Sequence, residues 1–319
     1  MNKLEDFIFP TQEELFKALK KEVEGKKVIV NGKYILVIGD APIMLLEHLD
    51  TVHKDRVTVI CKSNDGNILM SPQGIGGDDR CGVYALVTAY RASFFKPWLL
   101  FTCDEEIGGK GAEAFAYDYE NGKLPKKLEG IKYLIEIDRK GNNDAVYYDC
   151  ANDEFEDYIT GFGFKTASGS YSDICDVAPA LGVAAVNLSS GYYQAHTQHE
   201  YINRKELNAV VQTVIRMIGE SLDSDVPQFD WIERPYRYSK VGYRYYYEQC
   251  NWKEVLKEDE VPQDVPAQYV LAYEDLLDVY TVDEIEQVRQ AYGNEAIYEL
   301  YEDAFGPFTN STGVEQIIS

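Results

Sequence analysis

IMLLEHLD at residues 43–50 decides the fold, because this short apolar run ends abruptly in polar side chains. PWLLFTCDEE at 97–106 and YLIEIDR at 133–139 follow the same pattern. Such runs are typical of buried β-strands whose carboxyl ends open toward a site. AVYYDC at 145–150 and GVAAVNLSS at 182–190 are predicted as further strands.

Helix and hairpin signals surround these strands. Thr11 and Glu14 form a capping box before the first helix. Helices are predicted over residues 12–24, 80–93, 111–119 and 204–222. Hairpin turns are predicted at Asn31-Gly32 and Asp65-Gly66. Strands that alternate with helices indicate an α/β fold, and the early hairpins make its sheet mixed, so we predict a mixed β-sheet sandwiched between helices.

Charge and composition exclude several classes of protein. The chain has 319 residues, with 31 basic and 54 acidic side chains and a net charge of −23. A chain this acidic repels phosphate backbones, so we expect no binding of nucleic acid. The sequence contains no run of 18 apolar residues, so we predict no membrane-spanning helix. The N-terminal residues lack the apolar segment of a signal peptide, so we predict none. Six cysteines without a CxxC pair indicate reduced thiols, so we expect a cytoplasmic protein.

The composition changes near residue 223. Residues 223–319 hold 21 acidic and 7 basic side chains, so 14 of the 23 excess negative charges lie there. They also hold 12 of the 25 tyrosines, many of them in YRYSKVGYRYYYEQC at 236–250. We predict a first domain over 1–222 and an acidic, mainly helical extension over 223–319, with a capping box at Thr281–Glu284. The tyrosines are interpreted as packing surface, and an aromatic binding surface is the alternative.

Histidine is rare and clustered in this chain. Only four histidines occur, in HLDTVH at 48–53 and AHTQH at 195–199. Carboxylates mark three further motifs, which are Asp78-Asp79 in GIGGDDRCGV, Glu105-Glu106 in TCDEEIGG and Asp138 in IEIDRKG. Imidazoles and carboxylates from separate strand ends are the ligands that zinc or manganese sites require. Each piece alone is usually a surface feature, but five pieces in this order predict a metal site.

These motifs resemble those of the co-catalytic two-zinc exopeptidases, which include peptidase T, aminoacylase, glutamate carboxypeptidase, and the glutamyl and leucyl aminopeptidases. TCDEEIGGKGA at 102–112 is similar to the glutamate motif of peptidase T and the glutamyl aminopeptidases, and GGDDRCGV at 76–83 to the bridging-aspartate motif of the latter. SSGYYQAHTQHEYI at 189–202 resembles the terminal histidine motif of both. SYSDI at 170–174 is similar to a short Gly-Thr-Asp segment of the aminopeptidases. The resemblance covers roughly residues 40–220.

The resemblance implies a set of five metal ligands. His48 and Asp138 would bind one zinc ion, and Glu106 and His196 would bind the other. Asp78 would bridge the two ions. Cobalt or manganese would accept the same ligands.

Two further carboxylates have implied roles beside the metals. Asp50, two residues after His48 on a strand, projects to the same side and would fix the orientation of that imidazole. Glu105 would be the general base that takes a proton from the water between the metals and returns it to the leaving amine. A two-metal centre activates its own water, so the chemistry needs no side-chain nucleophile.

Other residues of these motifs carry alternative interpretations. Asp79 is predicted as a turn or cap residue. His53 is predicted to lie on a loop, with substrate contact as the alternative, and His199 is the alternative metal ligand of its segment. Tyr192 and Tyr193 are predicted to pack, and stabilisation of an oxyanion is the alternative for each.

Two insertions of the similar families have no room in this chain. Peptidase T and aminoacylase relatives insert a lid and dimerisation domain between the counterparts of Asp138 and His196, which are 58 positions apart here. The glutamyl-aminopeptidase relatives insert a small domain between the counterparts of Asp50 and Asp78, which are 28 positions apart here. The resemblance therefore implies a compact aminopeptidase body without a lid, and residues 223–319 are a candidate for shaping specificity.

We therefore expect a cytoplasmic two-zinc aminopeptidase that hydrolyses short peptides. An N-acyl-amino-acid deacylase or a carboxypeptidase is the alternative on the same scaffold, and activity on N-blocked substrates would favour it. A binding or structural protein that has lost catalysis is a further alternative, which the complete set of ligands and base disfavours. The sequence leaves the oligomeric state open.

Overall fold

The computed structural model describes residues 1–22, 27–169, 171–232, 265, 266, 269, 273, 276 and 282–305. The chain divides into two compact units, residues 1–242 and 243–319. The first unit holds two β-sheets, and each predicted strand contributes to them. The strand predicted over 145–150 ends at Val146, because Tyr148 and Asp149 have positive φ angles that turn the chain out of the sheet. The described part of the second unit contains the helices α10 (Val282–Tyr292) and α11 (Ala296–Phe305).

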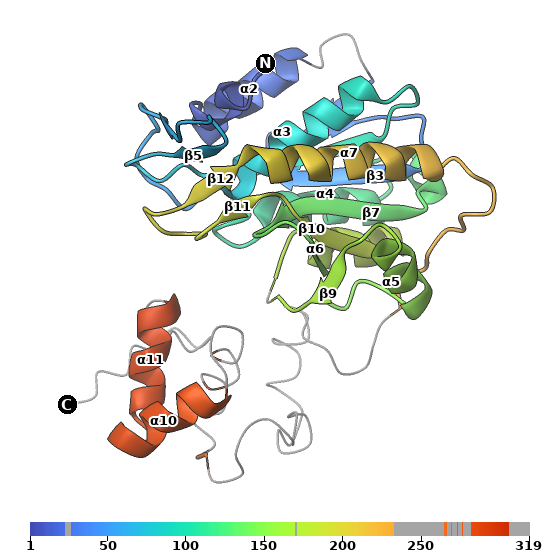
Figure 1. Cartoon of the computed structure of the whole chain (residues 1–319). Coiled ribbons are helices and arrows are strands. Elements are labelled where there is room, and N and C mark those ends of the chain that lie inside the picture. The colour runs from blue at the N-terminus through green and yellow to red at the C-terminus, as the bar shows by residue number, and fades with distance from the viewer. Residues whose placement is uncertain are drawn as a thin grey trace. The chain divides into compact units, whose positions relative to one another are not determined.

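A large mixed sheet forms the centre of the first unit (Figure 1). Its strands are β1 (Val28–Val30), β2 (Tyr34–Val37), β3 (Ile43–His48), β6 (Trp98–Thr102), β7 (Tyr133–Arg139), β8 (Asp144–Val146), β9 (Lys165–Ala167) and β10 (Ala185–Ser189). They lie in the order β1-β2-β6-β3-β7-β10-β8-β9. The central strands β6, β3, β7 and β10 are parallel, whereas β2 and β8 pair antiparallel with this group. The carboxyl ends of four neighbouring strands therefore meet at one edge of the sheet.

A small antiparallel sheet lies in the same unit. Its strands are β4 (Cys61–Lys62), β5 (Ile68–Met70), β11 (Tyr192–Tyr193) and β12 (Tyr201–Asn203). They lie in the order β11-β12-β5-β4. The pairing of β12 with β5 brings the segment around residue 196 next to the segment that precedes residue 78.

Helices cover both faces of the large sheet (Figure 1). One face packs against α1 (Glu5–Ile8), α2 (Gln12–Glu22), α3 (Gly77–Ala92), α5 (Asp153–Thr160) and α7 (Arg204–Glu220). The other face packs against α4 (Lys110–Glu120), α6 (Ile174–Leu181) and the short 3₁₀ helix η1 (Lys126–Gly130). Side chains along β3 alternate between the two cores, because Ile43 and Leu45 belong to one and Met44 and Leu46 to the other. The predicted mixed sheet between helices is confirmed.

Local signals in the sequence also form as predicted. The N–H of Thr11 donates to Glu14 Oε2 at 3.1 Å, and the N–H of Glu14 donates to Thr11 Oγ1 at 3.3 Å, which is the capping box at the start of α2. The antiparallel pairs β1–β2 and β4–β5 are the two predicted hairpins. None of the described helices is long and apolar enough to span a bilayer.

The intervals in which the similar families carry extra domains are occupied by elements of the sheets. Between Asp138 and His196, the described residues form β8, α5, β9, α6, β10 and β11. Between Asp50 and Asp78 they form the β4–β5 hairpin. The compact body without a lid therefore agrees with the described part of the chain.

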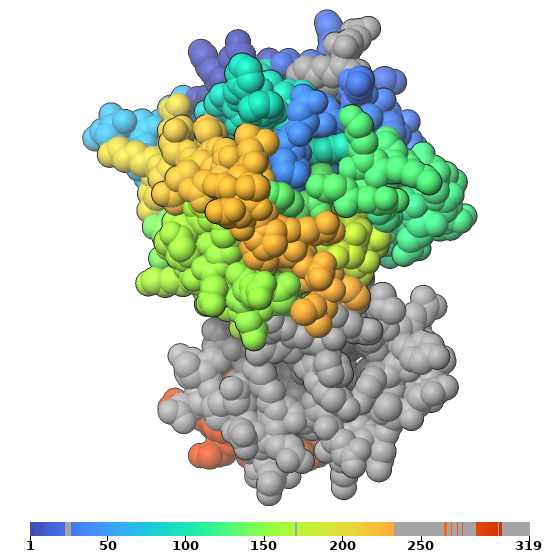
Figure 2. Space-filling model, turned by 90° about the vertical axis from the view of Figure 1, so that its right-hand side faces the viewer, coloured from blue at the N-terminus to red at the C-terminus, as the bar shows by residue number. Residues whose placement is uncertain are grey.

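The segment that follows α7 packs on the first unit, beyond residue 223 where the composition changes. Figure 2 shows this segment, in orange, on the surface of the unit. Phe229 is 4% exposed, and its ring centroid lies 5.1 Å from that of Phe155 and 5.2 Å from that of Tyr158. The N–H of Trp231 donates to the carbonyl oxygen of Gly182 at 3.1 Å. The first unit thus includes residues that the composition assigns to the extension.

The second unit has a small core of its own. Tyr273, Leu276, Ile285 and Ile297 are buried in it. Helices α10 and α11 agree with the predicted helical character of the extension. The tyrosine-rich run at 236–250 and the cap residue Thr281 lie outside the described residues.

Phe229→Ala is expected to lower the free energy of unfolding of the first unit by about 3–5 kcal/mol, because it opens a cavity in an aromatic cluster. Phe94→Ala is the matched control, since Phe94 is 90% exposed, and its effect is expected to stay within about 0.5 kcal/mol. Chemical denaturation monitored by circular dichroism measures both. Equal stability of the two variants would show that the segment after α7 does not belong to this unit.

Candidate metal centre

Five of the predicted side chains meet at the carboxyl edge of the central strands. His48 is the last residue of β3, and Asp138 lies at the end of β7. Glu106 lies in the loop after β6, and Asp78 lies in the first turn of α3 with non-helical backbone angles. His196 lies between β11 and β12, with a φ of +61°. The large sheet therefore positions three of these residues, and the small sheet brings in His196.

Asp78 stands between the two histidines. Its Oδ1 lies 3.2 Å from His48 Nε2, and its Oδ2 lies 3.2 Å from His196 Nε2. Asp138 Oδ1 lies 3.6 Å from His48 Nε2 on one side, and Glu106 Oε2 lies 3.5 Å from His196 Nε2 on the other. Asp78 is thus shared by two triads of possible ligands, with one imidazole in each.

Each triad has the dimensions of a metal site. Ligand atoms of His48, Asp78 and Asp138 lie within 4.8 Å of one another, and so do those of Asp78, Glu106 and His196. A third group of this size joins His48 to Glu105 and Glu106. Imidazole nitrogens and carboxylate oxygens are donors that zinc and manganese accept. These residues therefore could hold two metal ions about Asp78.

Unpartnered oxygen atoms also fit a cation. Asp138 Oδ1 and Glu106 Oε1 are buried and have no hydrogen-bond donor within the described residues. A buried carboxylate oxygen without a partner is costly. A metal ion between the carboxylates and imidazoles would satisfy both oxygen atoms.

The carboxylates and imidazoles of the site shift one another's pKa values. Burial acts to raise the pKa of Asp78, but the His196 and His48 imidazoles lower it well below its ordinary value. Hydrogen bonds with Asp78 and Glu106 raise the pKa of His196 to about 11. Burial acts to lower the pKa of His48, but the carboxylates of Asp138 and Asp50 raise it overall.

Asp50 lies against the other side of the His48 ring. Its Oδ1 is 3.3 Å from His48 Nδ1, so it faces the ring nitrogen that does not point at Asp78. The N–H groups of Glu105 and Glu106 donate to its two oxygens, each at 3.1 Å. Burial acts to raise the pKa of Asp50, but His48 and these backbone donors lower it. Asp50 therefore connects the strand end of His48 with the loop that carries the two glutamates.

Glu105 lies beside the possible ligands without belonging to either triad about Asp78. Burial raises its pKa to about 8, an effect that the charge of His48 opposes and the nearby carboxylates of Asp173 and Glu106 reinforce. A carboxylate with a pKa near neutrality can both accept and return a proton.

The structure distinguishes between the alternative interpretations of Asp79, His199 and Tyr192. Asp79 Oδ1 accepts the N–H of Gly82 at 2.9 Å. Asp79 has non-helical backbone angles, so it caps the regular turns of α3 that follow it, in agreement with the prediction. His199 is exposed and belongs to none of the possible metal groups among the described residues. The Tyr192 hydroxyl lies 3.1 Å from Asp78 Oδ2 and 3.0 Å from the Asp138 carbonyl oxygen, so its one proton is already engaged.

Two residues that hold the site together received no role of their own from the sequence. The Arg80 guanidinium donates to the carbonyl oxygens of Leu49 and Pro10, so it pins the chain beside Asp50. Glu200 is fully buried and accepts hydrogen bonds from His53 and from the backbone before Asp78. Both residues had a local signal, because Glu200 follows His196 by four positions in AHTQHE and Arg80 directly follows the Asp78-Asp79 pair.

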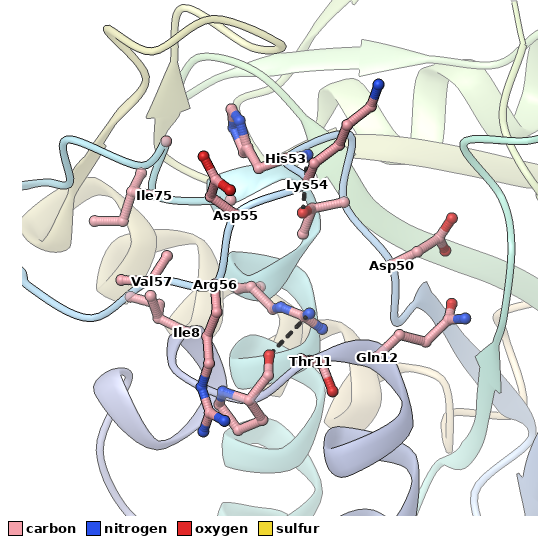
Figure 3. Close-up of a pocket in the computed structure, with 15 residues that line it drawn as sticks. Ile8, Thr11, Gln12, Asp50, His53, Lys54, Asp55, Arg56, Val57 and Ile75 are labelled. Carbon is pink, nitrogen blue, oxygen red and sulfur yellow. Dashed lines mark hydrogen bonds between the residues drawn. The ribbon is translucent and has the colours of Figure 1, made fainter.

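A cavity of about 200 Å³ lies beside the loop that follows His48. Figure 3 shows Asp50 on one side of it and the apolar side chains of Ile8, Val57 and Ile75 on the other. Arg80 and His53 also line it. The cavity therefore adjoins the residues that support His48.

Solved peptidases share this fold. Aminopeptidase PepT from Bacillus cereus matches at a TM-score of 0.51 and 15% identity, over 70% of this chain and 98% of that chain. A tripeptidase from Staphylococcus aureus matches at 0.50 and 13% identity, over 69% and 97%. A TET aminopeptidase from a Thaumarchaeota archaeon matches at 0.52 and 12% identity, over 71% and 99%.

The chain has the fold of these solved peptidases. The predicted resemblance is confirmed at the level of the fold by these structures. No protein-family model matches the sequence. No curated protein matches it at a significant level either.

Binding of zinc to the metal-free protein is expected to release at least two protons per chain, one from each imidazole. Burial and the Asp78 carboxylate raise the pKa of Asp138 well above its ordinary value, so Asp138 adds to this count. The raised pKa values of His48 and His196 mean that both rings hold a proton at pH 7. Each ring must lose that proton to bind a metal, so the affinity for zinc is expected to rise from about pH 6 to pH 8. Calorimetry in two buffers of different ionisation enthalpy counts the protons. A proton count near zero would contradict this arrangement of the site.

Proposed function

We propose that this protein is a metal-dependent exopeptidase with two zinc ions, and more specifically an aminopeptidase that acts on short peptides. The observation that carries the proposal is the position of Asp78, whose two oxygens each lie 3.2 Å from a different imidazole. A carboxylate shared in this way is what a pair of metal ions needs as a bridge. Cobalt and manganese are compatible with the same donors.

The residues divide between the two metal positions. His48 and Asp138 would hold one ion, Glu106 and His196 would hold the other, and Asp78 would contact both. When bound, two zinc ions would lower the pKa of a water molecule and polarise the carbonyl of the scissile peptide bond. The side chains around them would transfer protons and orient the ligands.

Glu105 would act as the general base. Its raised pKa of about 8 suits proton transfer near neutral pH. It would accept a proton from the attacking water and later deliver it to the nitrogen of the leaving amine. Asp50 would keep His48 in one orientation and one tautomer through its contact with Nδ1.

The choice of an aminopeptidase rests on the body of the protein and on the proteins that share its fold. Those proteins are described as an aminopeptidase, a tripeptidase and a TET aminopeptidase. The compact body offers no lid domain between Asp138 and His196, within the described residues, that would hold a substrate carboxylate. The free thiols of the five described cysteines are consistent with a cytoplasmic location, which is part of the proposal.

A tripeptide library with free N-termini is expected to be hydrolysed in zinc- or cobalt-supplemented buffer, and its N-acetylated twin is expected to remain intact. Mass spectrometry of the products identifies the bond that is cut. Cleavage of the acetylated library would instead establish a deacylase or a carboxypeptidase. Absence of cleavage in both libraries, with metal bound, would contradict the peptidase proposal.

Glu105→Gln is expected to keep its metal content and to lose turnover by about 10²–10⁴-fold, because it removes proton transfer alone. Glu113→Gln in α4 is the matched control, since Glu113 is exposed, and its turnover is expected to equal that of the wild type. Metal analysis and steady-state rates measure the two quantities separately. Near-normal rates in Glu105→Gln would assign the base to another residue.

A further inference from the structure

Glu200 is a buried carboxylate without a part in the proposed chemistry. Its side chain is 0% exposed, and it follows His196 by four residues. None of the possible metal groups in the described part of the chain includes it. A charged group is costly to bury unless donors surround it, so the donors around Glu200 indicate its role.

Three donors from two other segments converge on this carboxylate. The N–H of Gly76 donates to Glu200 Oε2 at 2.8 Å, and the N–H of Asp78 donates to Oε1 at 3.0 Å. His53 Nε2 lies 2.7 Å from Oε2 and donates the third hydrogen bond. Glu200 thus joins the loop that follows His48 to the turn that ends at Asp78.

The glycine-rich turn before Asp78 is shaped by these contacts. A Cβ atom on Gly74 would lie 2.2 Å from His53 Nδ1, and the φ of Gly74 is +80°. A Cβ atom on Gly77 would lie 2.6 Å from Tyr192 Cβ and 3.2 Å from Glu200 Oε1. Both positions therefore require glycine, because larger residues would push the turn away from His53 and Glu200.

We propose that Glu200 is a positioning residue for the shared carboxylate of Asp78 and that His53 holds Glu200 in place. The inference rests on the proposed two-metal function. Asp78 can serve two metal ions only if both of its oxygens keep fixed directions. Glu200 fixes the backbone of Asp78 by accepting a hydrogen bond from the N–H of Asp78. The Tyr192 hydroxyl, 3.1 Å from Asp78 Oδ2, helps to orient the side chain of Asp78.

A specific consequence distinguishes this role from that of a ligand. Both metal positions share Asp78, so displacement of its backbone weakens both of them together. Loss of His196, which serves one position, weakens that position first. The affinities of the two sites therefore report whether Glu200 acts through Asp78.

Glu200→Gln tests the proposal with a side chain of the same shape. One of the two terminal atoms of glutamine is a donor, so at least one of the three hydrogen bonds is lost. The affinity for both Co²⁺ ions is expected to fall about 10–100-fold, with a changed visible absorption spectrum. The value of kcat is expected to fall more than KM changes. Titration of the full chain with Co²⁺, followed by absorption, measures both affinities.

Glu206→Gln is the matched control. Glu206 accepts hydrogen bonds from Tyr193 and Asn142, at 2.7 Å and 3.0 Å. Within the described residues, neither bond involves the turn before Asp78. This variant is expected to bind Co²⁺ as the wild type does. His53→Gln removes one donor from Glu200 and is expected to weaken Co²⁺ binding by a smaller factor, which provides a second variant should Glu200→Gln fail to fold.

Amide hydrogen exchange of the metal-free protein tests the positioning directly. The amides of Gly76 and Asp78 are expected to exchange about tenfold faster in Glu200→Gln than in the wild type. This readout depends neither on metal nor on peptidase activity, so the proposal can fail separately from the proposed function. Unchanged exchange in Glu200→Gln and His53→Gln, or wild-type affinity for Co²⁺ in both, would overturn it.

Discussion

Negative charge concentrated at one edge of a buried sheet is the constraint on which the rest of this structure depends. Asp78, Asp138 and Glu106 lie around the two imidazoles, and Glu47 and Glu136 lie fully buried in the strands beneath. Burial and the neighbouring carboxylates raise the pKa of Glu136 well above its ordinary value. Acids this close are stable in a low dielectric only when protons, imidazolium groups or cations neutralise them. The density of acids therefore favours cations at this edge.

The arrangement of the strands explains why the charges gather there. Four parallel strands end at the same edge, and three of them deliver His48, Asp138 and the loop with Glu106. The strands β2 and β8 pair antiparallel with the two sides of this group and extend the sheet, and they contribute no metal ligand among the proposed ones. The small sheet supplies His196, because the pairing of β12 with β5 holds its segment next to the turn before Asp78. Two sheets thus contribute to one centre, and carboxylates such as Asp50 and Glu200 connect the loops between them.

Much of this could be predicted from the sequence, for local reasons. The apolar runs that end at His48 and Asp138 formed strands because their length and hydrophobicity fit a strand buried on both faces. The Thr11–Glu14 box and the two Asx-Gly hairpins formed because their hydrogen bonds close within a few residues. Short or interrupted helices and strands were the elements that the sequence did not predict. The helix α6 contains Pro179, and β11 spans two residues, so neither has a pattern of its own in the sequence.

The sequence by itself determined the kinds of side chain at the centre and their order along the chain, since the donors of a metal site must be imidazoles and carboxylates at strand ends. Only the tertiary structure decided which of them meet. It placed the two oxygens of Asp78 against different imidazoles. It also brought His53 into hydrogen-bond contact with Glu200 and left His199 exposed. It also packed Phe229 onto the first unit, past the change in composition. The physical reason is that these contacts join residues far apart in the chain, so they depend on strand pairing and side-chain packing that no local pattern encodes.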